Sequence, residues 1–219
     1  NLDYKKAAVI VNEKMEQLNS KIKTDYKPFN YYGSPKAKNV IIAMGSICDT
    51  IKSVIDNTGD KFGLVEVHLY RPFSQEFLLR AIPKSVKNIA VLDRTKEAGC
   101  IGEPLYLDVL GALKNRNINI VGGRYGLSSK NTTPNDIYDV FKMLEDNPKN
   151  NFTIGITDDI TDLSLDIEDF DIKNSKEILI YGYGSDGMVS ASKSIITLIG
   201  NNTDKYAQGY FEYDSKKSG

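Results

Sequence analysis

The sequence predicts an α/β protein: a three-layer α/β/α domain on a mostly parallel sheet, followed by a second, partial α/β unit. Two observations predict this class. Short, continuously apolar runs such as NVIIAM at residues 39–44 alternate with stretches whose apolar residues recur every three or four positions. Turns rich in Gly and Pro separate them. Strands of a parallel sheet read as unbroken apolar runs because helices cover both faces.

The first half of the chain begins with a helix that Asp3 caps. Ser46 and Asp49 have the spacing of a capping box, so they are predicted to begin the second helix. The elements expected here are a helix at 3–22, a loop at 23–38, a strand at 39–44, a helix from 46, a strand at 63–70 and a short helix through 77–81.

The next part repeats the strand-then-helix order. Thr133 is a predicted N-cap, Pro134 suits the first helical position, and Asp136 lies at the positive end of the helix dipole. The expected elements are a strand at 88–93, a helix from Glu103-Pro104 to 113, a strand at 117–121 and a helix from 133.

The polar, Pro-containing segment 146–151 is predicted to be a linker, which divides the chain into domains at 1–147 and 148–219. One strand–helix–strand unit cannot bury its own faces, so the second domain is expected to be truncated. Its expected elements are a strand at 152–156, an irregular acidic segment at 158–171, a strand at 177–181, a helix at 187–199 with Val189, Ile195, Ile196 and Ile199 inward, and a strand at 206–213.

Composition excludes several classes of function. The net charge of −1 argues against a nucleic-acid-binding surface. No apolar run approaches the ~20 residues of a membrane span, and no signal peptide is visible. Cys48 and Cys100 form no C-x-x-C pair, so no metal site is predicted and both are expected to be free, mostly buried thiols of a cytoplasmic protein. His68, the one histidine, is predicted to be a packed strand residue, and no catalytic residue is predicted.

The sharpest local motif is G-x-G-x-x-G at Gly182–Gly187, between a predicted strand and a predicted helix. Glycines there permit a tight turn, and the helix N-terminus offers N–H groups to a phosphate. A tight turn without a ligand remains the alternative. A nicotinamide cofactor would require an acidic residue such as Glu212 or Asp214, whereas Lys216 and Lys217 suit added phosphate unless they are simply solvated.

Two further loops follow strand ends at the edge where open α/β sheets bind ligands, at residues 93–99 and 122–130. Both are rich in charged residues or glycine. Each is predicted to form a ligand loop or a domain interface, with the interface favoured.

Long strings of the sequence resemble the middle of pyruvate:ferredoxin (flavodoxin) oxidoreductases. The strings are LYRPF (69–73), AVLDRTKEAGCIGEPLYLDV (90–109), GGRYGLSSKNTTP (122–134), FTIGITDDITDLSL (152–165), YGYGSDGMVSASKS (181–194) and YAQGYFEYDSKKSG (206–219). The resemblance covers nearly the whole chain in order. It implies a transketolase C-terminal-like, Rossmann-like domain, followed by the start of a coenzyme A-binding domain.

The resemblance also implies a function. The parent enzyme would decarboxylate pyruvate oxidatively with CoA to acetyl-CoA in anaerobic metabolism, and would pass electrons to ferredoxin or flavodoxin. It would be a homodimer whose thiamine diphosphate, magnesium and [4Fe–4S] clusters lie on other domains. This chain would supply scaffold and part of the CoA site, and would be inactive alone. The implied cofactor-binding residues are Gly184, Ser185, Asp186, Gly187, Lys216 and Lys217.

The sequence departs from the family at several positions. Met188, Ser190 and Ser192 stand where the family commonly has Thr, Gly and Asn, and these positions adjoin the implied CoA loop. Ala98 and His68 stand where Pro and a basic residue are common. Three alternatives remain open: another 2-oxoacid as substrate, a nicotinamide-binding dehydrogenase lobe, and a structural dimerisation module without a ligand.

Overall fold

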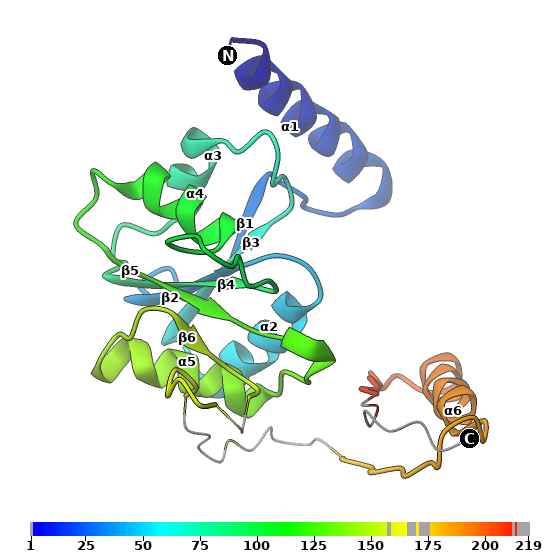
Figure 1. The fold of residues 1–219 in the computed structure, drawn as a ribbon. Coiled ribbons are helices and arrows are strands. Elements are labelled where there is room, and N and C mark those ends of the chain that lie inside the picture. The colour runs from blue at the N-terminus through cyan, green and yellow to red at the C-terminus, as the bar shows by residue number, and fades with distance from the viewer. Residues whose placement is uncertain (1, 157–158, 166–169, 171–175, 212, 214–219) are drawn as a thin grey trace. The chain divides into compact units, whose positions relative to one another are not determined.

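The computed structural model describes residues 2–156, 159–165, 170, 176–211 and 213 (Figure 1). The chain forms two units. The first comprises residues 1–128 and 132–173, and the second comprises 129–131 and 174–219. The division therefore falls later in the chain than the predicted boundary after residue 147.

The first unit is built on a six-stranded sheet in the order β1-β3-β2-β4-β5-β6. The strands are β1 (Phe29–Gly33), β2 (Asn39–Ala43), β3 (Phe62–Val67), β4 (Asn88–Asp93), β5 (Asn119–Arg124) and β6 (Phe152–Thr153). Only β1 pairs antiparallel, at the edge beside β3; the other pairings are parallel. The predicted α/β class with a mostly parallel sheet is confirmed.

Helices cover both faces of this sheet (Figure 1). Along residues 2–146 the helical elements are α1 (Leu2–Ile22), α2 (Ile47–Thr58), α3 (Gln75–Ala81), α4 (Pro104–Leu113), the 3-10 turn η1 (Leu127–Ser129) and α5 (Pro134–Asp146), of which α2, α3, α4 and α5 pack on the sheet. One buried cluster joins the sheet to α2 and α5, and a second joins it to α3 and α4. In the first cluster, the rings of Phe62 and Phe141 stack at 4.2 Å between centroids.

The central strands show why continuous apolar runs predicted this fold. All five residues of β2 are buried, so both faces of the strand are covered. Ile41 packs in the cluster with α2 and α5, while Val40 and Ile42 pack in the cluster with α3 and α4. A fully buried side chain of this size contributes about 1.5–3 kcal/mol by leaving water.

Two local predictions about the first unit are wrong. Residues 23–38 were predicted to be a loop because they contain Pro28 and Pro35, but they include the edge strand β1. Ser46 makes no cap, because its backbone is already helical (φ −61°, ψ −23°) and its side chain accepts no cap bond. The capping box is instead formed at α5, where the side chains of Thr133 and Asp136 each accept from the other's N–H.

Residues 146–151 are not an open linker. The Asn150 side chain accepts from the Gly122 N–H at 2.8 Å, and the Asn151 carbonyl accepts from Arg124 at 3.3 Å. The strand that follows, β6, pairs with β5 instead of opening a second domain. The Phe152 ring of β6 packs directly against Gly123 of β5: a Cβ added at Gly123 would lie 2.1 Å from this ring.

The second unit contains α6 (Met188–Asn202). The described residues at 176–181 and 206–213 form no strand, so both strand predictions fail there. The helix is confirmed, but it has no buried residue, and Ile195 is 45% exposed. The returning chain contacts α6: a Cβ on Gly209 would lie 2.4 Å from Ile196, and Lys193 lies over the Phe211 ring.

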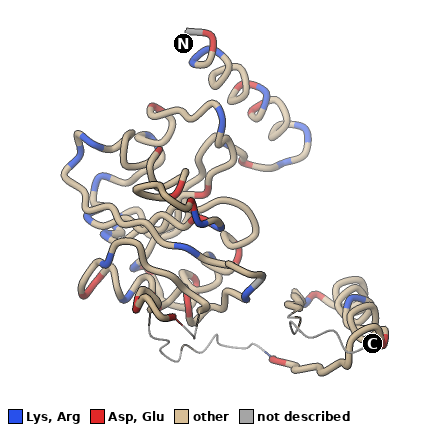
Figure 2. The backbone as a smooth tube through the Cα atoms, in the orientation of Figure 1, with Lys and Arg blue, Asp and Glu red and all other residues tan. Residues whose placement is uncertain are grey.

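Charges of both signs are interspersed along α1 and over the first unit (Figure 2). Among the described residues, no helix is both long enough and apolar enough to cross a membrane.

Candidate functional site

The glycine-rich loop directly precedes α6, as the motif predicted. It combines three residues with positive φ: Gly184 at 82°, Ser185 at 50° and Gly187 at 82°. A positive φ costs glycine nothing, whereas it strains a serine. Residues 182–187 are all exposed, so the backbone of the loop can be reached by a ligand.

Asp186 closes this loop on itself. Its Oδ2 accepts from the Tyr183 N–H at 2.7 Å, and its Oδ1 accepts from the Met188 N–H at 3.1 Å. These backbone donors, Met188 first and Tyr183 second, lower the pKa of the Asp186 carboxyl. The charged form therefore lies at the N-terminus of α6, where the helix dipole favours a negative charge.

Gly182 makes room for this carboxylate. A Cβ at Gly182 would lie 3.1 Å from Oδ2 and 3.2 Å from Oδ1 of Asp186. By contrast, a Cβ on Gly184 or Gly187 would meet nothing within 4 Å, so glycine is favoured at these two positions by their positive φ and not by lack of space. The three glycines of the motif thus have a structural explanation within the loop.

Four of the six predicted site residues therefore lie together, in the turn at Gly184–Gly187. Lys216 and Lys217 lie outside the described residues, as do Glu212 and Asp214, the acids considered for a nicotinamide ribose. The convergence of the loop and the lysines on one ligand stays a prediction.

In the first unit, the carboxyl ends of β4 and β5 carry a buried charged cluster. Asp93, the last residue of β4, is 5% exposed. Its two oxygens accept from the N–H groups of Leu105 (3.0 Å) and Tyr106 (3.1 Å), in the first turn of α4. Burial raises the pKa of Asp93, and these two bonds oppose the rise in part.

Glu103 and Arg124 form the ion pair of this cluster. Arg124 Nε donates to Glu103 Oε1 at 2.6 Å, and the two side chains are 13% and 2% exposed. Glu103 is the N-cap residue of α4 but makes no side-chain cap bond, because Asp93 bonds the helix N–H groups instead. Among the described groups, Glu103 Oε2 is a buried oxygen without a hydrogen-bond partner.

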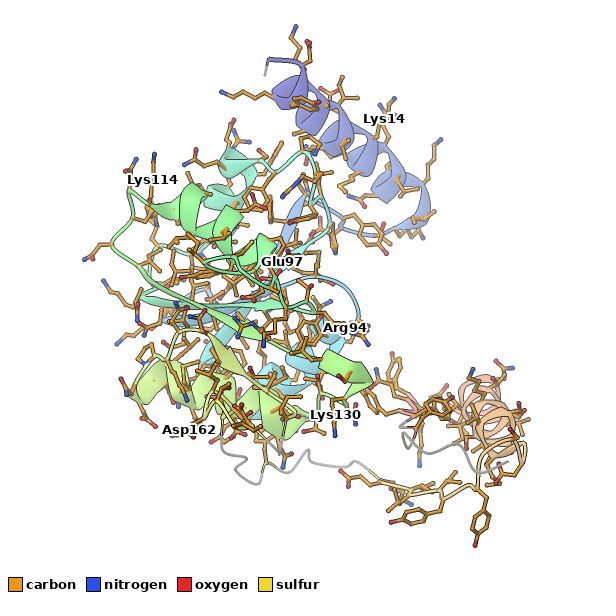
Figure 3. All side chains as sticks on the ribbon, in the orientation of Figure 1. Lys14, Arg94, Glu97, Lys114, Lys130 and Asp162 are labelled. Atoms are coloured by element: carbon orange, nitrogen blue, oxygen red, sulfur yellow. The ribbon has the colours of Figure 1, made fainter. Side chains whose placement is uncertain are left out.

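The remaining loop residues at this edge are more open. Arg94 and Glu97 stand on the exposed loop that follows β4 (Figure 3). A Cβ on Gly126 would lie 2.9 Å from Arg94 Nε, which places the two strand-end loops against each other. Among the described residues, no group of three His, Cys, Asp or Glu side chains could hold a metal ion.

His68 lies just beyond the end of β3, so the prediction of a strand residue is wrong, although its ring does pack against neighbours. Its Nδ1 is 3.0 Å from the Lys27 carbonyl, and its ring meets Tyr26 edge-on at 5.3 Å. The roles of Glu103 and Arg124 were not predicted. An acid just before a helix-starting proline reads as a cap, and only the register of β4 against β5 brings Arg124 beside it.

The sequence is similar to a well-defined group of enzymes. Residues 37–137 match the family model described as pyruvate:ferredoxin oxidoreductase core domain II. The chain is 50% identical to the pyruvate:ferredoxin oxidoreductase of Moorella thermoacetica, over 96% of this chain and 19% of that protein. It is 48% identical to the pyruvate-flavodoxin oxidoreductase of Enterobacter agglomerans, over 100% of this chain and 20% of that protein.

A third relative, the probable pyruvate-flavodoxin oxidoreductase of Escherichia coli, is 49% identical over 95% of this chain and 19% of its own length. The chain thus spans about a fifth of the length of the curated relatives it matches. The chain is thus similar, over nearly its whole length, to an internal region of pyruvate:ferredoxin and pyruvate-flavodoxin oxidoreductases.

Proposed function

We propose that this chain works as part of a longer, cytoplasmic and homodimeric enzyme that oxidises pyruvate with CoA to acetyl-CoA and passes the electrons to ferredoxin or flavodoxin. The observation that carries the proposal is 46–50% identity to pyruvate oxidoreductases over at least 95% of the chain. The names of those relatives supply the substrate and the electron acceptors. The matched relatives are about five times longer, so other domains of the same polypeptide are the first partners.

The first unit acts as scaffold in this proposal. Its sheet is covered on both faces, and its charged groups at the strand ends are bonded within the unit: Asp93 to backbone N–H groups at the start of α4, and Glu103 to Arg124. Such a closed cluster suits a rigid support better than a reaction centre. The exposed loop at 94–101 is available to contact a neighbouring domain.

The second unit contributes to CoA binding. CoA carries a diphosphate and a ribose phosphate. The exposed loop Gly184–Gly187 would contact the ligand through its backbone and side chains, and Lys216 with Lys217 would pair with phosphate charge. Thiamine diphosphate with magnesium would stabilise the carbanion formed from pyruvate, and [4Fe–4S] clusters would carry the electrons. Two cysteines cannot supply a four-cysteine cluster, so those groups are assigned to other domains.

The CoA proposal is tested in the full-length enzyme. Changing both Lys216 and Lys217 to Ala should raise the KM for CoA about tenfold or more and leave the KM for pyruvate unchanged, since one charge-assisted contact is worth about 1.5–3 kcal/mol. The matched control is Lys5→Ala with Lys6→Ala, a pair of adjacent lysines exposed on α1. Equal effects of the two double variants on CoA would make Lys216 and Lys217 ordinary surface charges.

The isolated chain is expected to be inactive. After reconstitution with thiamine diphosphate, iron and sulfide, it should reduce no dye with pyruvate and should show no broad absorbance near 400 nm. Pyruvate-dependent reduction by the purified chain would contradict the proposed division of labour. Replacing pyruvate by 2-oxoglutarate in the full-length enzyme decides between the 2-oxoacid substrates.

A further inference from the structure

The start of α6 is already occupied by a negative charge. A phosphate held at a helix N-terminus uses open N–H groups and the positive end of the dipole. In α6 the first of these donors, the Met188 N–H, is bonded to the Asp186 carboxylate at 3.1 Å. The first turn, Met188–Ala191, contains no lysine or arginine. An incoming diphosphate would therefore meet a like charge at the place where the motif alone predicts its binding.

The same carboxylate gives the loop its shape. It joins Tyr183, the second residue of the motif, to Met188, the first residue of α6, and so spans the whole turn. A side chain at position 182 would crowd both carboxylate oxygens, so the glycine there leaves room for this group. Ser185 is held at a positive φ between the two anchors, although serine does not favour that conformation.

We propose that Asp186 is a positioning residue: its carboxylate holds the Gly182–Gly187 loop in shape and keeps the phosphates of CoA away from the first turn of α6. The inference rests on the proposed CoA function. It assigns the exposed loop backbone to an uncharged, hydrogen-bonding part of CoA, and it leaves the phosphates to Lys216 and Lys217. Asp186 is thereby removed from the set of direct phosphate ligands.

The experiment compares two substitutions at one position in the full-length enzyme. Asp186→Asn removes the charge and can keep one of the two loop bonds, since its amide has a single acceptor oxygen, whereas Asp186→Ala removes both. Asp204→Asn, an exposed aspartate just after α6, is the matched control. The dissociation constant of CoA is measured by calorimetry, beside the KM values for CoA and pyruvate. Inorganic pyrophosphate, as a competitor of CoA, reports on the diphosphate position.

The positioning role predicts rescue by the conservative variant. Asp186→Ala should weaken CoA binding about fivefold or more, because two hydrogen bonds that fix the loop are lost. Asp186→Asn should weaken CoA binding less than Asp186→Ala does, because one loop hydrogen bond can remain, and pyrophosphate should inhibit it more strongly, because the repelling charge is gone. The KM for pyruvate should not change in any of the variants.

Two results would overturn the inference. If Asp186→Asn weakens CoA binding as much as Asp186→Ala, the charge itself contacts the ligand. If pyrophosphate inhibits Asp186→Asn no more strongly than it inhibits the wild type, the carboxylate does not keep phosphates away from α6. Failure of the CoA proposal itself looks different, since CoA binding would then be unchanged in Asp186→Ala and also in the Lys216, Lys217 double variant.

Discussion

Replacing Arg124 by Met should destabilise the first unit strongly. Met keeps an unbranched, apolar side chain of similar length but removes the guanidinium group. Glu103 would then retain a negative charge on a side chain that is only 2% exposed. Its second oxygen already lacks a hydrogen-bond partner among the described groups, so the charge would have little compensation.

The expected loss in the free energy of unfolding is about 3–5 kcal/mol, the usual result of removing one partner from a buried ion pair. For a chain of this size, 1 kcal/mol corresponds to a change in Tm of about 2–4 °C, so Tm should fall by about 6–20 °C. Adding Glu103→Gln removes the stranded charge and should restore a large part of the loss. The difference between the single and double variants measures the coupling.

The assay is urea unfolding of the 219-residue chain, followed by far-ultraviolet circular dichroism. Arg80→Met is the control, because Arg80 pairs with Glu76 on the surface of α3 and the two side chains are 67% and 71% exposed. It should cost no more than about 1 kcal/mol. If Arg124→Met lowers the free energy of unfolding as little as Arg80→Met does, the buried pair of Glu103 and Arg124 contributes no more than a surface pair, and the reasoning is wrong.

Two further predictions concern titratable groups. Because burial raises the pKa of Asp93, the folded chain binds its proton more tightly than the unfolded chain. The free energy of unfolding of the wild type, relative to that of Asp93→Asn, should be greatest near pH 4 and should decline as the pH rises. Urea unfolding of both proteins at pH 4.5, 5.5 and 7 measures this difference. A difference in unfolding free energy that does not change with pH would contradict the prediction. Burial also raises the pKa of the Cys48 thiol to about 12, whereas Cys100 is exposed. Iodoacetamide at pH 8 should therefore alkylate Cys100 alone, with Cys48 reacting only in urea, as peptide mass spectrometry would show.

The sequence predicted the sheet well because burial on both faces leaves a signal in every residue. The buried runs of β2 and β4 are continuous in the sequence and in the structure. The edge strand β1 leaves no such signal, since two of its five residues are exposed and prolines lie on both sides. The Thr133 cap was predictable because the bonds of a capping box are local.

Prediction failed where distant residues decide the outcome. The segment 146–151 reads as a linker, yet its Asn150 side chain bonds to Gly122, 28 residues away. At the candidate site the motif predicted the turn but not the acceptor of its N–H groups. The spacing of the glycines is the same whether the N–H groups of the loop bind a phosphate or, as here, bind the carboxylate of an aspartate in the loop.

The bond between Asp93 and the start of α4 also bears on how the protein can be altered. This bond joins the two ends of the loop at residues 94–102. Asp93 is the residue just before the loop, and Leu105 is the second residue of α4, the helix that follows the loop. The two ends of the loop are therefore held together by this bond, whatever the length of the chain between them. Doubling the length of such a loop costs only about 0.6 kcal/mol in closure entropy. This position can therefore accept an inserted peptide or a fluorescent reporter while the sheet stays intact.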